Sequence, residues 1–360
     1  MKQHLQEFDI LRSIATFTVI AIHITAGYVL ISPLAYIGNQ LARFAVPFFI
    51  TLSGFLLYNA DLNGHGLKAG DFYRRRFDRI LWPYVIWTCF YVFMGGIIGH
   101  DIGLALSRLP GHLLWGTGCY HLYFLVIIIQ LYLLYPGLRM VMQKRPGLLI
   151  GGSFLLTLTA QFLLYLAMTS RISLDPAYNN FNLVFFPVWL FYFVLGMWAA
   201  REKENWQQKL EGKILLITSI WFIALSVLFL DSHFTGTYGS SIRPSVMFYT
   251  VSSYFLFYVI ALRYQQTTPG WVNWVAQQSF LIYLIHPAIL TGLIYGAALI
   301  GWPDLWGRTR GMVVQYLLVT ALSLLGSYLI SRTPLAEKLG GKTRKSDKPD
   351  PSNLSSSLSP

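Results

Sequence analysis

The chain has 360 residues, of which 55% are hydrophobic, 16% aromatic and only 12% charged. A soluble globular protein carries about 25% charged residues, so the composition excludes an ordinary soluble domain and favours a chain surrounded largely by lipid. The net charge of +12 does not by itself indicate nucleic acid, and we expect no nucleic-acid partner because the distribution of the charge suits a membrane protein.

Transmembrane helices are the first elements that the pattern predicts, because a hydrocarbon core of about 30 Å takes roughly 20 apolar residues. Ten segments meet that length, at approximately 10–31, 37–58, 80–99, 120–139, 147–169, 181–200, 213–231, 245–263, 279–300 and 311–331. We therefore predict an all-α, polytopic membrane bundle of about ten helices over residues 1–335. The polar, Ser- and Pro-rich stretch 336–360 is predicted to be a disordered basic tail.

The orientation follows from the placement of Lys and Arg, which favour the cytoplasmic side. With the N-terminus inside, 20 of the 27 Lys and Arg residues fall in cytoplasmic segments and 5 fall in outer ones. Both termini are therefore expected in the cytoplasm. The apolar run at the N-terminus contains Arg12 and His23, so we interpret it as a retained first helix rather than a signal peptide.

Arg12 and His23 are two ionisable residues within the first predicted helix, where such groups are costly and require a reason. Their spacing of eleven residues turns the helix through three full turns and about 20° more, over about 16 Å. They therefore lie on one face, with a cation near the cytoplasmic surface and an imidazole near mid-membrane. The alternative is that Arg12 reaches the lipid headgroups and His23 bonds a neighbouring helix.

Arg43 lies in the outer half of the second predicted helix, within RFAVPFFITLSGFLL. Pro47 would break the helical hydrogen bonding there, and Ser53-Gly54 would allow another helix to approach closely. A buried salt bridge at a packing kink is one interpretation, but few carboxylates are available within the spans. A wet cavity or an anionic ligand is therefore the preferred partner for Arg43.

Four guanidinium groups lie beside the third helix in DFYRRRFDRILWPY, and they are Arg74, Arg75, Arg76 and Arg79. They would suit anionic lipid headgroups, and they would equally suit the phosphates of a nucleotide-bearing cofactor from the cytosol.

His121 opens the fourth helix and His286 lies within the ninth, where a lone histidine is more often a packing residue. Cys89 and Cys119 show no metal-binding spacing, so we predict packing thiols and no metal site.

Five segments of the chain, taken together, resemble the acyltransferase-3 family of membrane-bound O-acyltransferases. EFDILRSIATFTVIAIH contains the hallmark Arg, ten residues, then His of that family, here Arg12 and His23. The segments RFAVPFFITLSGFLL, YRRRFDRILWPY, HLYFL and SFLIYLIHP follow in the order of the family's motifs, from residue 8 to about 290. The aromatic residue after His-Leu is often Trp in the family, and here it is Tyr123.

The resemblance implies transfer of an acyl group, with acetyl the expected one, from cytoplasmic acyl-CoA to a hydroxyl of a cell-surface or lipid-linked glycan. It places the protein in the bacterial plasma membrane among membrane lipids. It also implies that a further transfer step would need a partner protein, because the extracellular domain that some members carry is absent. His23 would be the general base, since imidazole titrates near neutrality and such catalysis is worth about 10²–10⁴-fold.

The resemblance also suggests functions for the other candidate residues. Arg12 would be catalytic beside His23, binding the donor or its carbonyl oxygen and holding its reactive end, and the four arginines of the basic segment would hold the CoA phosphates. The candidates for contacting the acceptor or stabilising charge are Arg43, His121, His286, Tyr283 and Ser53. An acyl-histidine relay through His23 is an alternative to direct transfer.

Two other classes of protein fit parts of the pattern. A polysaccharide exporter would use buried cations to line a path for an anionic sugar, and it would need no base at His23. A non-catalytic sensor or scaffold would leave Arg12, His23 and Arg43 without a purpose. The acceptor, the acyl chain, the choice between O- and N-transfer and the oligomeric state are open at this level.

Overall fold

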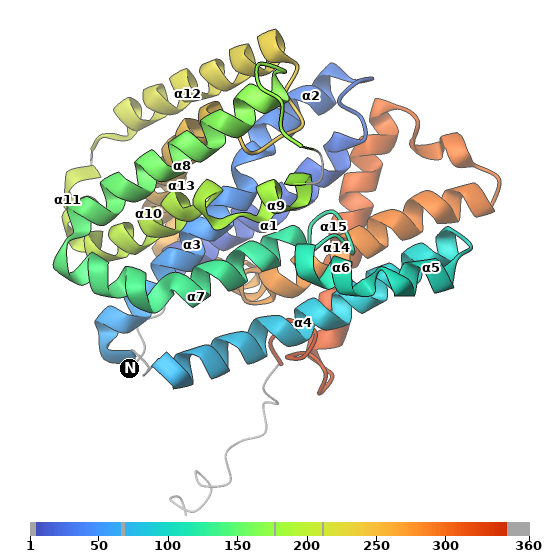
Figure 1. Ribbon diagram of the computed structural model, residues 1–360, viewed down its shortest axis with the longest axis horizontal. Coiled ribbons are helices and arrows are strands. Elements are labelled where there is room, and N and C mark those ends of the chain that lie inside the picture. The colour runs from blue at the N-terminus through green and yellow to red at the C-terminus, as the bar shows by residue number, and fades with distance from the viewer. Residues whose placement is uncertain (1–4, 66–68, 176–177, 211, 344–360) are drawn as a thin grey trace, which may run out of the picture.

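The computed structural model describes residues 5–65, 69–175, 178–210 and 212–343, and the regular elements in these ranges are all helices (Figure 1). Nine helical segments in the described ranges are long and apolar enough to cross a bilayer. They are Gln6–Ala26, Pro33–Gly64, Gly70–Ile98, Tyr123–Lys144, Pro146–Met168, Ile214–Thr235, Pro244–Thr267, Gly270–Leu299 and Thr309–Ser331. The prediction of an all-α multi-pass membrane bundle is confirmed.

The helices that make up these nine segments are α1 (Gln6–Ala26), α2 (Pro33–Leu41), α3 (Ala45–Ala60), α4 (Ala69–Ile98), α7 (Tyr123–Lys144), α8 (Pro146–Met168), α12 (Ile214–Thr235), α13 (Pro244–Tyr264), α14 (Gly270–Leu299) and α15 (Thr309–Ser331). Short helices join them, namely α5 (Ile102–Ser107), α6 (Leu109–Trp115), α11 (Lys203–Leu210) and the turns η1 (Ala42–Phe44), η2 (Asp61–His65), η5 (Gln265–Thr267) and η6 (Pro303–Trp306). The second predicted span is α2 and α3 joined through η1, with Arg43 inside that junction.

The sixth predicted span, 181–200, is not one continuous helix. The chain forms α9 (Asn179–Val184), a turn η4 (Phe186–Val188) and the 12-residue helix α10 (Leu190–Arg201). The backbone is extended at Phe185, with φ −64° and ψ 121°, so the helical ladder stops there. A break at membrane depth is tolerated only where neighbouring groups satisfy the freed backbone.

Polar side chains of α7 and α8 satisfy the backbone at this break. Gln130 donates to Val184 O at 2.8 Å and accepts from Phe186 N at 3.2 Å. Thr157 donates to Pro187 O at 2.7 Å. Gln161 donates to the carbonyl of residue 188 at 3.0 Å. The break itself, from Val184 to Val188, is therefore held inside the bundle, while the start of α9 is exposed.

Helices α3 and α10 pack closely enough that only glycine fits at two points. A Cβ on Gly54 would lie 2.0 Å from Phe193 O, and one on Gly196 would lie 1.9 Å from Thr51 O. Small residues permit this kind of backbone approach in membrane bundles. The expectation that Gly54 allows another helix to come close is met by α10.

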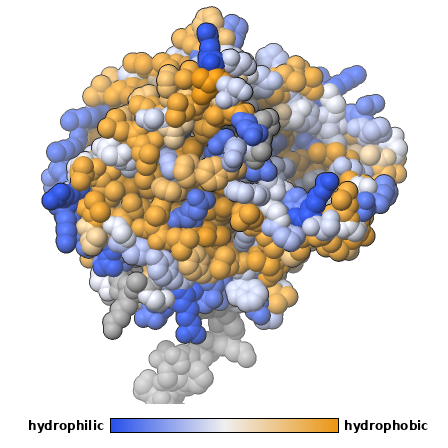
Figure 2. All heavy atoms as spheres, viewed as in Figure 1, coloured by the Kyte–Doolittle hydropathy of each residue, from blue (hydrophilic) through white to orange (hydrophobic). Residues whose placement is uncertain are grey.

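Helix α1 occupies the interior, where it contacts α2, α3, α13, α14 and α15 (Figure 1). Ser13 of α1 donates to Val272 O at 3.0 Å, and Phe8 stacks on Phe55 with ring centroids 3.8 Å apart. Helices α8, α12 and α15 lie at the periphery and expose apolar side chains such as Leu215. The face seen in Figure 2 is largely apolar, with hydrophilic side chains mainly at its margins, as a lipid-facing surface requires.

Candidate functional site

Three histidines from separate parts of the chain meet in the interior of the bundle. His23 comes from α1, His286 from α14, and His121 from the turn before α7. The ring centroid of His286 lies 5.3 Å from that of His23 and 5.7 Å from that of His121. His121 and His286 are fully buried, whereas His23 is partly exposed. We call these three residues the histidine cluster.

The tautomer of His286 follows from its hydrogen bond. Its Nδ1 lies 2.8 Å from the carbonyl oxygen of Tyr283, which can only accept, so Nδ1 carries the proton. That carbonyl is free because residue 287 is a proline, which has no N–H for the helical bond. In the neutral ring Nε2 is then a lone-pair acceptor, and it has no hydrogen-bond partner among the described residues.

Aromatic hydroxyls hold the rest of the cluster in place. Tyr283 donates its hydroxyl to His121 O, and the two rings lie 5.1 Å apart between centroids. Tyr91 donates to Leu284 O at 2.6 Å, which fixes α4 against α14 beside the cluster. Neither ring nitrogen of His121 has a hydrogen-bond partner within the described part of the chain. The cluster therefore contains buried imidazole nitrogens that make no hydrogen bond of ordinary geometry within the described residues.

A cavity of about 240 Å³ approaches the cluster from the end of α1 that carries Arg12, and we call it the Arg12 cavity. Its wall has four cationic residues and no Asp or Glu among the described residues that line it. The cationic residues are Arg12, Arg76, Arg79 and Lys342. Such a wall is suited to an anion.

The Arg12 cavity divides the predicted candidates into two groups. Arg76 and Arg79 line it, and Arg74 and Arg75 do not, although Arg79 is exposed like them. The other predicted residues on its wall are Ser53, which donates to Phe49 O at 2.9 Å within its own helix, and Tyr283. Because Tyr283 also contacts the histidine cluster, its ring stands between the cavity and the imidazoles.

A second cavity, of about 690 Å³, is lined by residues at the C-terminal end of α1, and we call it the His23 cavity. His23 and Arg43 line it, together with aromatic and hydroxyl-bearing residues. These are Tyr120, Tyr123, Trp189, Tyr238, Ser240 and Ser241. The ring of Tyr120 lies 4.6 Å from that of His23 between centroids, which places an aromatic face beside the imidazole.

Within the described residues Arg43 is held by backbone and amide oxygens, and not by the salt bridge that was one interpretation of the sequence. It donates to Gly239 O at 2.7 Å and to the side-chain oxygen of Asn39. Asn39 in turn donates to Ile22 O and to Thr25 Oγ1, both at 3.0 Å. Asn39 thus links Arg43 to α1 directly beside His23.

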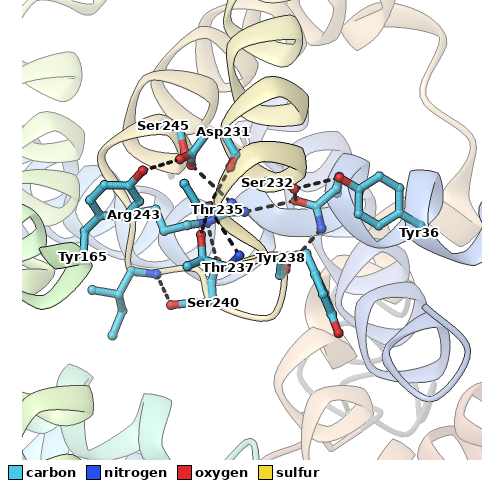
Figure 3. Close-up of polar contacts among 12 residues, drawn as sticks. Tyr36, Tyr165, Asp231, Ser232, Thr235, Thr237, Tyr238, Ser240, Arg243 and Ser245 are labelled. Carbon is cyan, nitrogen blue, oxygen red and sulfur yellow. Dashed lines mark hydrogen bonds and ion pairs between the residues drawn. The ribbon is translucent and has the colours of Figure 1, made fainter. Parts of the chain in front are cut away.

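An ion pair at the far side of the His23 cavity was not identified from the sequence (Figure 3). Arg243 Nη1 lies 3.2 Å from Asp231 Oδ2, while its other nitrogens donate to Gln40 Oε1 at 3.0 Å and Ser240 O at 3.1 Å. Asp231 also accepts from the hydroxyl of Tyr165 at 2.7 Å. Burial lowers the pKa of Arg243, and the charge of Asp231 opposes that shift.

These contacts fix the chain segment that forms one wall of the His23 cavity, residues 238–242. Gln40 donates to Tyr238 O at 3.1 Å, and Arg43 holds the next carbonyl, of Gly239. Figure 3 shows Arg243 and the loop beside it converging on Asp231 and Ser232 at the end of α12. The network therefore positions Arg43 and the loop relative to each other.

These features define a multi-pass membrane protein with two cavities near one histidine cluster. The aromatic-walled cavity includes His23, and the cationic-walled cavity is separated from the cluster by Tyr283. The chain belongs to the acyltransferase-3 family, whose sequence model, described as an acyltransferase domain, matches residues 5–332. No solved structure matches this chain.

Relatives in the comparison carry two kinds of name. The protein named "Putative membrane-bound acyltransferase YfiQ" from Bacillus subtilis (strain 168) is 23% identical over 347 residues, which cover 91% of this chain and 92% of that one. The "Probable poly-beta-1,6-N-acetyl-D-glucosamine export protein" of Staphylococcus aureus (strain MRSA252) is 25% identical over 272 residues, 72% of each chain. The protein of that name from Staphylococcus epidermidis is 23% identical over 274 residues.

Proposed function

We propose that this acyltransferase moves an acyl group, acetyl in the first instance, from cytoplasmic acyl-CoA to a hydroxyl of a cell-surface or lipid-linked glycan. The observation that carries the proposal is the position of His23. It lines one cavity and contacts His286, which is 6.0 Å from Tyr283 on the wall of the other cavity. A donor and an acceptor that arrive from opposite ends would meet at these residues.

The Arg12 cavity would receive the donor. Its cations have the charge that the phosphates of CoA require, and charge-assisted bonds from guanidinium to phosphate are among the stronger polar contacts. Because the cavity is small, we expect it to hold part of the donor, with the thioester end directed toward Tyr283. For the Arg12 cavity to open toward His23, the rings of Phe49, Phe124 and Tyr283 would have to move apart, because they pack together at centroid distances of 5.4 to 6.4 Å.

The chemistry assigned to His23 is general base catalysis. Its imidazole takes the proton of the acceptor hydroxyl as that oxygen attacks the thioester carbonyl, the C–S bond breaks, and the CoA thiolate is protonated on leaving. General base catalysis of this kind is worth about 10²–10⁴-fold. The lone pair on His286 Nε2 is placed to accept a hydrogen bond within the cluster, and His121 would stabilise charge there. An acyl-histidine on His23 is the alternative route to the same product.

The His23 cavity would receive the acceptor. Aromatic rings such as Tyr120 and Trp189 offer faces to the C–H surfaces of a sugar, while Ser240 and Arg43 offer hydrogen bonds to its hydroxyls or to an anionic group. We assign this end of the bundle to the outer side of the bacterial cell membrane. The basic segment of α4 and both termini then lie in the cytoplasm, as the Lys and Arg distribution favours.

The test uses purified protein in liposomes, with labelled acetyl-CoA supplied to the Arg12 side and a panel of glycans supplied to the other. CoA release and transfer of label are followed for the wild type, for His23→Ala and for His233→Ala. His233 is exposed and lines neither cavity, so its variant is the matched control. We expect acceptor-dependent CoA release that falls about 10²–10⁴-fold in His23→Ala alone.

The exporter function is the second candidate, favoured by the printed names of the staphylococcal relatives. It predicts sugar movement without thioester consumption and no dependence on His23. Undiminished acyl transfer by well-folded His23→Ala would show that His23 is not the general base. No thioester consumption by the wild type across several acyl-CoAs and acceptors would favour the exporter.

A further inference from the structure

The chain does not leave the bundle at the end of α15. Residues 344–360 of the predicted tail lie outside the described residues, but residues 336–343 fold back against α4 and α14. Trp87 of α4 donates to Leu339 O at 3.1 Å. Gln278 of α14 donates to Lys342 O at 2.9 Å and accepts from Lys342 N at 3.1 Å. We call Leu339–Lys342 the C-terminal strap.

Two glycines allow the strap to lie flat on α14. Gly340 has φ +92°, a backbone conformation that other residues rarely adopt. A Cβ there would come within 2.9 Å of Leu284 and 3.0 Å of Phe280. A Cβ on Gly341 would lie 3.0 Å from the side-chain oxygen of Gln278. The two glycines therefore allow the strap to pack directly against one position on α14.

The strap also forms part of the wall of the Arg12 cavity. Gly340 and Lys342 line that cavity together with Arg12 of α1 and with Arg76 and Arg79 of α4. The cationic residues thus come from three separate segments of the chain and surround one small space. Lys338, in the preceding turn, is exposed like Lys342 but does not line the cavity.

We propose that the C-terminal strap is part of the donor site and that Lys342 binds a phosphate of the CoA moiety. The inference rests on the proposed function, because it takes acyl-CoA as the occupant of the Arg12 cavity. The two hydrogen bonds to Gln278 fix the backbone of Lys342 at the cavity wall, so only its side chain has to be ordered when the ammonium group binds the anion. A lysine serves as a point charge for phosphate, and the arginines nearby add directed hydrogen bonds.

The experiment measures the dissociation constant of CoA by calorimetry, with the full-length protein in nanodiscs of neutral lipid. The variants are Lys342→Gln and, as the matched control, Lys338→Gln. We expect Lys342→Gln to weaken CoA binding about tenfold, equivalent to ~1.4 kcal/mol, and Lys338→Gln to leave it unchanged. The loss should shrink at high salt, where charge contributes less.

A second variant tests the position of the strap rather than the charge of Lys342. Gln278→Leu removes both hydrogen bonds to Lys342, and we expect it to weaken CoA binding by a similar factor. In that background Lys342→Gln should add little, because the ammonium group is no longer positioned. Equal thermal unfolding midpoints of all variants would show that the bundle remains folded.

The outcomes separate the strap from the overall function. If the wild type binds no CoA, the proposed function and this inference both fail. If the wild type binds CoA and Lys342→Gln binds it equally well, the strap inference fails and the function stands. A lipid phosphate is the other source of the same chemistry. If Lys342→Gln loses affinity for phosphatidylglycerol vesicles while its CoA affinity is unchanged, Lys342 is a lipid contact and the inference is overturned.

Discussion

Arg76 and Arg79 lie three residues apart on α4 and line the Arg12 cavity, whereas Arg74 and Arg75 on the same helix do not. The four therefore provide matched substitutions of one residue type. We expect Arg76→Gln and Arg79→Gln each to raise the dissociation constant of CoA about 10- to 100-fold, since a hydrogen bond to a charged group is worth about 1.5–3 kcal/mol. Arg74→Gln and Arg75→Gln should leave it nearly unchanged. Equal losses in all four, measured by calorimetry, would mean that the segment acts only through its total charge.

Asn39 is fully buried and bonds Arg43 and α1 at once. Asn39→Leu keeps the approximate volume but strands one nitrogen of Arg43, whereas Thr25 Oγ1 still donates to Ala21 O and Ile22 O. A stranded buried group costs about 1–3 kcal/mol, so the thermal midpoint in detergent should fall. We also expect the KM for the acceptor to rise while CoA affinity is unchanged, because Asn39 does not line the Arg12 cavity.

The control for Asn39→Leu is Asn205→Leu on the surface helix α11, where the side chain is exposed. A midpoint that falls with no change in the acceptor KM would show that Asn39 acts on stability alone. Wild-type values for both quantities would contradict the linking contact described above.

The sequence predicts part of this chemistry because an ionisable group in an apolar helix is conspicuous. Arg12, His23, Arg43 and His286 were identified in that way, although their proximity was not, since helix packing is not contained in hydrophobic periodicity. Asn39 was missed even though it lies four residues before Arg43 and thus on the same helix face. Arg243 and Asp231 were missed because each lies at a span end, where a charge is ordinary.

Among the contacts between helices, the contact of α3 with α10 leaves the least room for a side chain larger than glycine. A Cβ on Gly196 would lie 1.9 Å from Thr51 O, a backbone atom that cannot turn away. We expect Gly196→Ala to force the two helices apart and to lower the thermal midpoint strongly, by a destabilisation on the order of the 1–3 kcal/mol typical of overpacking or more.

The matched control for that substitution is Gly152→Ala, in the interior of α8. A Cβ there meets no atom within 4 Å, and alanine favours a helix over glycine by about 1 kcal/mol. Its midpoint should therefore be unchanged or slightly higher. If Gly196→Ala were as stable as Gly152→Ala, the close packing of α3 on α10 would be wrong.

Helix α10 also shows where sequence reasoning about elements reaches its limit. The apolar residues of 181–200 meet the length of a span, so a continuous helix was predicted. Pro187 was visible in that stretch, but a proline alone permits either a kink or a break. The break is stable because Gln130, Thr157 and Gln161 satisfy it, and they belong to helices whose position the sequence does not specify.

For the whole molecule, composition and spacing were sufficient for the fold class, because lipid exposure demands long apolar helices wherever they pack. The two cavities required the three-dimensional arrangement. They open from opposite ends of α1, and Arg12 and His23 share one face of that helix as their spacing indicates. One uninterrupted helix thus supplies a group to each cavity.

This arrangement makes sidedness the decisive property of the molecule, and we expect the Arg12 cavity to face the cytoplasm. In a background with Cys89 and Cys119 replaced by alanine, a cysteine at Thr237 should react with an impermeant thiol reagent in intact cells. A cysteine at Lys338, on the opposite side, should react only after the cells are made permeable. Addition of CoA should leave both rates unchanged, since neither residue lines the Arg12 cavity.

The functional arm of the same experiment uses sealed inverted vesicles, in which the cytoplasmic face is outside. Acetyl-CoA added outside should be consumed there, whereas right-side-out vesicles should be inactive until acetyl-CoA is loaded within. The reason is that CoA, a large polyanion, does not cross lipid, and the cationic wall that would bind it lies at one end of the bundle only. Consumption from the Thr237 side would reverse the direction of transfer and assign the donor to the His23 cavity.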